Sequence, residues 1–277
     1  MIFSPEEVAK RKLQTLQKEL LVELCREVGI LAKGAVPDLI VGLLRSQIAQ
    51  PTIDNFIRMA YREAKSRRPY TGDDLRHEVS KVERHTWGTI QGELDQHIQT
   101  HYVRRLFRYE DLLQAVERDL RETVANYALS TWYNFWTTVI VEDIIAEHPV
   151  IVPTVKKVKD TDLFWLGQPW DLKHTNLPRE WFKDGYTIAD AMEKPVMAEE
   201  YLYRLQGEQR FGANNRLFLI MADSKHPEET WKLKRDFRRI ADAVDEFFDT
   251  TKAFDEVSFV YKGKPYIAHS KILFVVK

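Results

Sequence analysis

The sequence predicts an α+β (α/β-type) protein, with a helical N-terminal region followed by a mixed five- to six-stranded sheet flanked by helices. Two observations carry this prediction. Up to about residue 148, apolar residues recur at three- and four-residue spacing among many charged ones, which is typical of amphipathic helices. After Pro149 the chain contains short runs rich in β-branched and aromatic residues, which are typical of strands.

Composition limits the classes of protein that the chain can belong to. Its 277 residues are 44% hydrophobic, which is enough for one large domain or for a main domain with a small appendage. The 41 basic and 42 acidic residues exclude a globally basic nucleic-acid coat but allow local basic patches. The single cysteine, Cys25, excludes internal disulfides and multi-thiolate metal sites, so we expect a reducing, intracellular setting. No apolar run is long enough to span a membrane, and no signal peptide is recognisable.

A small helical module is predicted over residues 1–50. Ser4 and Pro5 are typical of a helix start, and leucines then recur at helical spacing as far as Leu24. Gly29 is a plausible end of this helical stretch. A second short helix is expected after Pro37.

A helical region is predicted over residues 51–148, interrupted near Pro69 and Gly72. It includes an aromatic run between Tyr127 and Trp136, which we interpret as core or interface rather than as a base-stacking surface. We expect this region to link the module to the rest of the chain and to form a dimer surface.

The third predicted region, residues 149–277, contains most of the strands. The hydrophobic pattern gives the order β-β-β-α-β-α-β-β, which indicates a mixed sheet. Strands are expected at residues 150–158, 162–166, 169–175, 217–222, 256–261 and 266–276, and helices at residues 188–208 and 228–249.

Two aspartates and a lysine are predicted to converge on one hairpin. Strand alternation places Asp171, Lys173 and Thr175 on one face and His174 on the other. The turn at Gly167 brings the chain back, so that Asp162 can lie beside Asp171. Two carboxylates suit Mg²⁺, and a nearby ammonium can orient or deprotonate an attacking water. The pattern therefore indicates metal-assisted phosphodiester hydrolysis, although a surface hairpin with an ordinary Asp/Lys pair is the alternative.

The arrangement of Asp162 followed by Asp171-Leu172-Lys173 resembles the catalytic pattern of the PD-(D/E)xK nucleases, notably type II restriction endonucleases. The resemblance covers roughly residues 140–277 and implies a restriction-endonuclease-like core. It also implies that Asp162 and Asp171 bind Mg²⁺ and that Lys173 assists the nucleophilic water.

In that family a glutamate on a preceding helix often supports the site. Glu142 is the nearest candidate here, and Glu93 and Glu83 are alternatives. The residue before Asp162 is Thr161, where the family often has proline. No Gly-rich phosphate loop is present, so no nucleotide cofactor is expected.

The N-terminal module resembles the SAP domain, a small helical DNA-binding module. The resemblance rests on Leu20-Leu21, Leu24 to Ile30, Lys33-Gly34 and Asp38-Leu39-Ile40. It implies DNA contacts through Lys33 and Arg45, although Val36 stands where a basic residue is usual. A dimerisation or packing role for the module is equally compatible with the sequence.

Further candidate DNA contacts lie close to the predicted site in sequence. Lys156 and Lys157 come shortly before Asp162 and are placed to contact phosphates. Arginine pairs well with guanine and asparagine with adenine in the major groove. On this basis the base-reading candidates are Asn214, Asn215 and Arg216, and Arg179 is a similar candidate. Arg210 and Thr175 are further candidate DNA contacts, and an ordinary loop is the alternative for the segment from residue 210 to 216.

The sequence therefore leads us to expect a Mg²⁺-dependent, sequence-specific double-stranded DNA endonuclease of the type II restriction class. Because such enzymes usually read palindromic sites, the resemblance implies a homodimer. It also implies a location in the cytoplasm of a prokaryotic cell. Two alternatives stay open. One is a structure-specific repair or recombination nuclease, and the other is a non-catalytic DNA-binding protein with a degenerate site.

Overall fold

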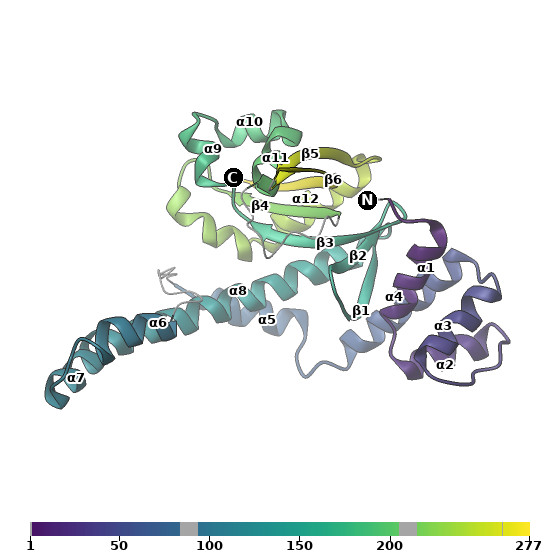
Figure 1. Cartoon of the computed structure of the whole chain (residues 1–277), viewed down its shortest axis with the longest axis horizontal. Coiled ribbons are helices and arrows are strands. Elements are labelled where there is room, and N and C mark those ends of the chain that lie inside the picture. Colours follow the sequence, from purple (N-terminus) through teal and green to yellow (C-terminus); the bar gives the residue numbers. More distant parts are fainter. Residues whose placement is uncertain (1, 84–93, 205–214, 262) are drawn as a thin grey trace. The chain divides into compact units, whose positions relative to one another are not determined.

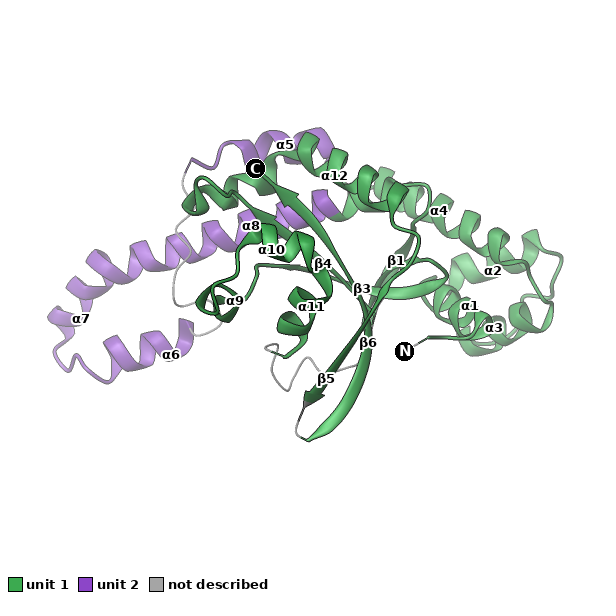
Figure 2. Ribbon diagram, turned by 90° about the horizontal axis from the view of Figure 1, so that it is seen from above, with its two compact units in different colours: residues 1–69, 142–277 green, residues 70–141 purple. Residues whose placement is uncertain are grey.

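The computed structural model describes residues 2–83, 94–204, 215–261 and 263–277. The chain forms two compact units, coloured separately in Figure 2. Unit 1 comprises residues 1–69 and 142–277, and unit 2 comprises residues 70–141. This division differs from the predicted regions 1–50, 51–148 and 149–277, because the N-terminal helices belong to the same unit as the sheet.

Four helices open unit 1: α1 (Pro5–Gln14), α2 (Lys18–Glu27), α3 (Val36–Arg45) and α4 (Gln50–Ser66). Ser4 caps α1 as expected, since its hydroxyl accepts the Glu7 backbone N–H (3.3 Å) and the Glu7 carboxylate accepts the Ser4 N–H (2.8 Å). Gly29 follows the end of α2 with φ of +72°, a left-handed conformation that glycine adopts without strain.

The long first helical stretch is split in two at Thr15. The carbonyl of Thr15 accepts a hydrogen bond from the backbone N–H of Lys156 (3.1 Å), which belongs to the first strand. The Thr15 hydroxyl donates to the Lys12 carbonyl (2.7 Å). These two hydrogen bonds take the place of backbone bonds that would continue the helix. As a result, α1 ends where β1 pairs with Thr15.

A mixed six-stranded sheet forms the rest of the scaffold, as predicted (Figure 1). Its strand order is β1-β2-β3-β4-β6-β5; the pairs β3–β4 and β4–β6 are parallel and the other pairs are antiparallel. The strands are β1 (Val152–Val158), β2 (Thr161–Trp165), β3 (Gln168–Thr175), β4 (Arg216–Ala222), β5 (Asp255–Tyr261) and β6 (Lys264–Val276).

The N-terminal helices share their hydrophobic core with this sheet. Leu13, Leu24 and Ile53 pack in one buried cluster with Val152 of β1 and Phe164 of β2. The N-terminal helical module therefore buries its apolar surface against the edge of the sheet.

Helices cover both faces of the sheet (Figure 1). On one face Leu202 and Tyr203 pack with Phe218 of β4 and Ile272 of β6. On the other face, Phe248 packs edge-on against Trp165 of β2, with ring centroids 5.1 Å apart. The helices of the first face are α9 (Arg179–Lys183), α10 (Ile188–Glu193) and α11 (Pro195–Arg204); Phe248 belongs to α12 (Phe237–Thr250).

The helix expected over residues 228–249 is divided. Its first part, Pro227–Arg235, is a 3₁₀ helix (η4), and Asp236 then caps α12 by accepting the Arg239 backbone N–H (3.3 Å). An aspartate at this position favours a new helix start over continuation of the previous one.

Unit 2 is helical in its described part, as expected. Its elements are α5 (Gly72–Ser80), α6 (Leu94–Ile98), the π-helical η1 (Gln99–Val103), α7 (Tyr109–Ala115), the π-helical η2 (Val116–Leu120) and the first part of α8 (Arg121–Glu147), which continues into unit 1. Among the described residues, no helix is both long and apolar enough to cross a membrane.

Replacing a leucine of the core shared by the helices and the sheet tests how much this core stabilises unit 1. Leu24 is fully buried, so Leu24→Ala removes buried methyl groups and leaves a cavity. We expect the free energy of unfolding, measured by urea denaturation, to fall by about 2–5 kcal/mol. Leu31→Ala is the control, because this side chain is 82% exposed and its loss should change little. Equal effects of both variants would contradict the shared core.

Candidate active site

The β2–β3 hairpin brings Asp162 and Asp171 to the same place on the sheet. Leu163 pairs with Trp170, and Trp165 pairs with Gln168. One step further along this antiparallel register, Asp162 stands opposite Asp171, and opposite residues point to the same face. The backbone N–H of Leu172 donates to the Asp162 carboxylate (2.9 Å), which fixes that side chain beside β3.

Two cations face the carboxylate of Asp171. The Lys173 ammonium lies 2.7 Å from Oδ1, and Nε of Arg216 lies 3.4 Å from Oδ2. The side chains of Asp171 and Arg216 are only 10% and 5% exposed, whereas that of Lys173 is 37% exposed. Asp171 is thus a buried anion compensated from both sides, as a buried charge requires.

Desolvation by the surrounding protein raises the pKa of two carboxyl groups in this cluster, although both residues are exposed. For Asp162 the negative charge of Asp171 adds to the rise, and the Leu172 N–H and Lys173 oppose it. For Glu142 the charge of Asp162 contributes next, whereas Lys157 lowers the pKa. Glu142 therefore lies close enough to Asp162 for their charges to interact.

A buried polar network holds the end of α8 that carries Glu142. The neighbouring Asp143 accepts hydrogen bonds from the Tyr61 hydroxyl (2.6 Å) and from the Arg68 guanidinium (2.7 Å). Both partners come from α4 or the residues directly after it. This network fixes the last turns of α8 against α4, and with them the backbone position of Glu142.

His174 lies outside this cluster, as strand alternation predicted. Its ring is buried, and its burial, together with the positive charges of Lys234 and Lys173, lowers its pKa to about 4. Because Lys234 belongs to η4, this ring faces the side of the sheet opposite to Asp171. His174 is a neutral core residue at physiological pH.

A second buried acid, which the sequence reasoning missed, lies on α11. Glu199 has no exposed surface, and its carboxylate lies near the Ser270 hydroxyl. Burial raises the pKa of Glu199 to about 8, the charge of Asp255 adds to the rise, and Lys271 and Ser270 oppose it. The available signal was that Glu199 occupies the same helical stripe as the apolar Leu202 and Tyr203.

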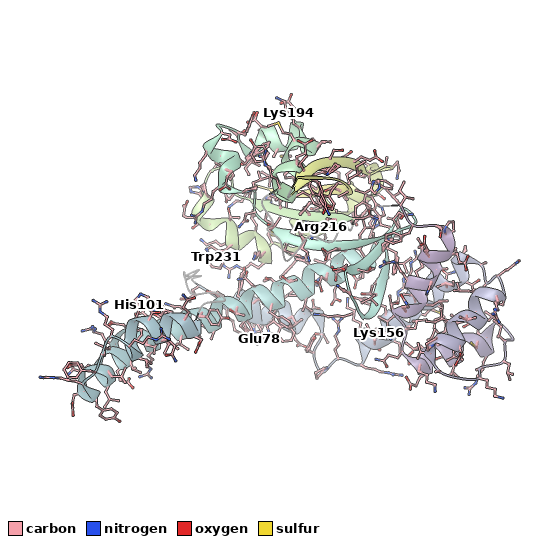
Figure 3. The ribbon with its side chains drawn as sticks, in the orientation of Figure 1. Glu78, His101, Lys156, Lys194, Arg216 and Trp231 are labelled. Atoms are coloured by element: carbon pink, nitrogen blue, oxygen red, sulfur yellow. The ribbon has the colours of Figure 1, made fainter. Side chains whose placement is uncertain are left out.

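Two of the predicted base-reading residues do not lie on an exposed loop. Asn215 is 1% exposed and donates a side-chain hydrogen bond to the Pro169 carbonyl (3.1 Å). Arg216 is the first residue of the buried strand β4 (Figure 3). Its Nε faces the Asp171 carboxylate. Contact with DNA bases by these two side chains does not fit such burial, because the strand pairing turns them inward. Arg210 and Asn214 lie outside the described residues.

The other predicted DNA contacts are accessible. Lys33, Arg45, Lys157 and Arg179 are exposed, and Lys156 and Thr175 are half-buried. Lys156 lies on β1 (Figure 3). Lys157, by its effect on the pKa of Glu142, is the predicted contact that lies beside the carboxylates.

The donor set fits a magnesium ion with a small number of protein ligands. In the part of the chain that the structure describes, no three His, Cys, Asp or Glu side chains are arranged to hold an ion together. Magnesium commonly keeps several waters and uses only one or two carboxylates with substrate phosphates. Asp162 and Asp171, opposite each other on paired strands and with mutually unfavourable charges, meet that requirement. Of the alternative glutamates, Glu93 lies outside the described residues and Glu83 belongs to unit 2.

Comparison with protein-family models, with curated proteins and with solved structures finds no match to this chain.

The raised pKa of Glu199 predicts a specific dependence of stability on pH. Below the ordinary carboxyl pKa of 4.5, Glu199 is protonated in both the folded and the unfolded chain. Between about pH 4.5 and 8 the unfolded chain releases this proton while the folded protein keeps it, so the free energy of unfolding falls as pH rises. The side chain of Glu199→Gln cannot ionise, so this variant should avoid the fall in the free energy of unfolding, which is on the order of a few kcal/mol.

Urea denaturation at pH 5 and pH 8 measures this effect. We expect the stability of Glu199→Gln relative to the wild type to increase from pH 5 to pH 8. Glu200→Gln, an exposed neighbour on the same helix, is the matched control and should follow the wild type at both pH values. If the free energy of unfolding changes equally with pH in Glu199→Gln and in the wild type, the prediction that Glu199 is buried and protonated is wrong.

Proposed function

We propose that this protein is a Mg²⁺-dependent endonuclease that hydrolyses double-stranded DNA, in the manner of a type II restriction enzyme. The observation that carries the proposal is the position of Asp162 opposite Asp171, with the Lys173 ammonium 2.7 Å from Asp171. Two carboxylates and a lysine on one partly open face are the groups that metal-assisted phosphodiester hydrolysis requires.

Each residue has a distinct role in this proposal. Asp162 and Asp171 hold the metal, which when bound polarises the phosphate and lowers the pKa of a coordinated water. Lys173, which has the more exposed of the two cationic side chains facing Asp171, orients the attacking water and offsets negative charge on the phosphate. Glu142 adds negative charge beside Asp162. As the water oxygen bonds to phosphorus, the bond to the leaving oxygen breaks, and that oxygen gains a proton.

The proposed DNA path runs past the basic residues that are accessible near the site. Lys157 lies close enough to Glu142 to lower the pKa of that carboxyl. Lys33 and Arg45 of the SAP-like module are exposed and are proposed to contact phosphates. Thr175 and Arg179, after the end of the catalytic strand, remain the candidates for contact near the bases.

A homodimer belongs to this proposal, because palindromic sites require two-fold symmetry. Unit 2 is the candidate dimer surface, because several of its large apolar side chains are exposed. They lie on α7, on α8 and between η1 and α7: Phe107, Tyr109, Leu113, Leu129, Trp132 and Phe135.

A second candidate function is a non-catalytic DNA-binding protein. It is favoured by the pairing of Asp171 with both Lys173 and Arg216, an arrangement that also occurs where ion pairs serve stability alone. In that case the exposed basic residues would still bind DNA, but no metal would be needed.

Digestion of unmodified phage DNA with and without Mg²⁺ separates these functions. We expect discrete fragments that require Mg²⁺, and a fall in cleavage rate of at least about 100-fold in Lys173→Ala, because loss of one group that stabilises the transition-state charge costs that much. Asp162→Asn should also abolish cleavage through loss of a metal ligand.

The matched control is Asp160→Asn. Asp160 lies two residues away in the β1–β2 turn, has a positive φ of 59° that asparagine tolerates, and is exposed. Asp160→Asn should cleave DNA like the wild type. A smear would indicate the structure-specific alternative, and a complete lack of metal-dependent cleavage on linear, branched and methylated DNA would indicate the non-catalytic one.

Lys157→Ala tests the proposed phosphate contact. Loss of one phosphate contact should weaken binding to all DNA sequences alike and reduce the slope of log affinity against log salt by about 1. Fluorescence anisotropy with a labelled duplex measures the affinity and its salt slope. The titrations are made at several salt concentrations, with Ca²⁺ in place of Mg²⁺. Lys252→Ala, an exposed lysine after α12, is the control; an identical slope for Lys157→Ala and the wild type would remove this contact from the proposal.

A further inference from the structure

Arg216 is held rigidly beside the candidate metal site. Its guanidinium carbon lies 5.4 Å from the centre of the Tyr203 ring, a distance typical of a cation–π contact. Tyr203 is itself fixed, because its hydroxyl donates to the His269 carbonyl (3.2 Å) and its ring stacks on Phe259 with centroids 5.2 Å apart. A continuous set of contacts therefore runs from β6 through Tyr203 and Arg216 to Asp171.

The two cations that face Asp171 differ in their freedom to move. Lys173 is 37% exposed and carries its charge on a flexible four-carbon stem. Arg216 is 5% exposed and lies between β4 and the Tyr203 ring. A metal ion that approaches Asp171 can displace the ammonium from Oδ1, whereas the guanidinium near Oδ2 has no comparable route into solvent.

We propose that Arg216 is a positioning residue that reserves Oδ2 of Asp171, so that the site binds one divalent ion instead of two. The inference rests on the proposed metal site. In two-ion centres the ions lie about 3.5–4 Å apart and need shared or adjacent anionic ligands. A second ion on the Oδ2 side of Asp171 would meet the fixed positive charge of Arg216.

The Lys173 ammonium lies 2.7 Å from Oδ1, so a divalent ion held by Asp171 would compete with Lys173 for this oxygen. Arg216 would keep Asp171 oriented from the Oδ2 side, because its guanidinium also lies over the Tyr203 ring.

Titration of the full-length protein with Mn²⁺, followed by the electron paramagnetic resonance signal of the free ion, tests the inference. We expect one bound Mn²⁺ per chain in the wild type and none at this site in Asp171→Asn. In Arg216→Met, which keeps an unbranched apolar stem but loses the charge, we expect two bound ions. The first of them should bind at least about tenfold tighter, because a neighbouring positive charge is gone. Arg216→Lys should restore a stoichiometry of one.

Arg204→Met is the matched control. Arg204 also lies over a tyrosine ring of α11, 4.5 Å from the centre of Tyr201, but it is exposed. Arg204→Met should bind Mn²⁺ like the wild type. Two ions in the wild type, or unchanged stoichiometry and affinity in a folded Arg216→Met, would overturn the inference alone. No Asp171-dependent ion in the wild type would overturn the proposed nuclease together with it. If Arg216→Met does not fold, the wild-type stoichiometry still decides between one ion and two.

Discussion

The register between β2 and β3 is the constraint on which the candidate site depends. Side chains alternate along a strand, so a slip of one residue would turn Asp162 away from Asp171. Aromatic packing on the opposite face opposes such a slip: Trp170 is fully buried, and its indole N–H donates to the Trp165 carbonyl (2.9 Å). Trp165 in turn packs against Phe248. The polar face of the hairpin is therefore held in place by its apolar face.

The parts that could be predicted from the sequence are those whose causes are local. The β2–β3 hairpin follows from a short turn between two alternating runs, so Asp162, Asp171 and Lys173 could be placed together before any tertiary contact was known. The cap at Ser4 is equally local. Helix and strand types in unit 1 were predicted well for the same reason, although the break at Thr15 needed a strand that lies far along the chain.

The remaining features depend on partners distant in sequence, which no local pattern specifies. Asn215 and Arg216 follow a polar segment and were therefore interpreted as loop residues, but pairing of β4 beside β3 makes them part of the interior. Burial of an arginine is acceptable there only because Asp171 faces it. The packing partners of the N-terminal module cannot be predicted from its own sequence for a related reason. Its apolar face is completed by Val152 and Phe164, which no pattern within residues 1–50 can indicate.

This shared core also bears on the order in which the protein acquires structure during synthesis. Chains emerge from the ribosome starting at the N-terminus. In the sequence, the residues of unit 2 come between the two segments that form unit 1. The first four helices consequently leave the ribosome well before the strand residues that cover their apolar faces. Contacts of such large sequence separation form slowly, so the N-terminal helices must stay partly uncovered until the hairpin that carries the aspartates has been made. Both the candidate site and the N-terminal core thus depend on the same hairpin, which supplies Asp162 and Asp171 to the one and Phe164 to the other.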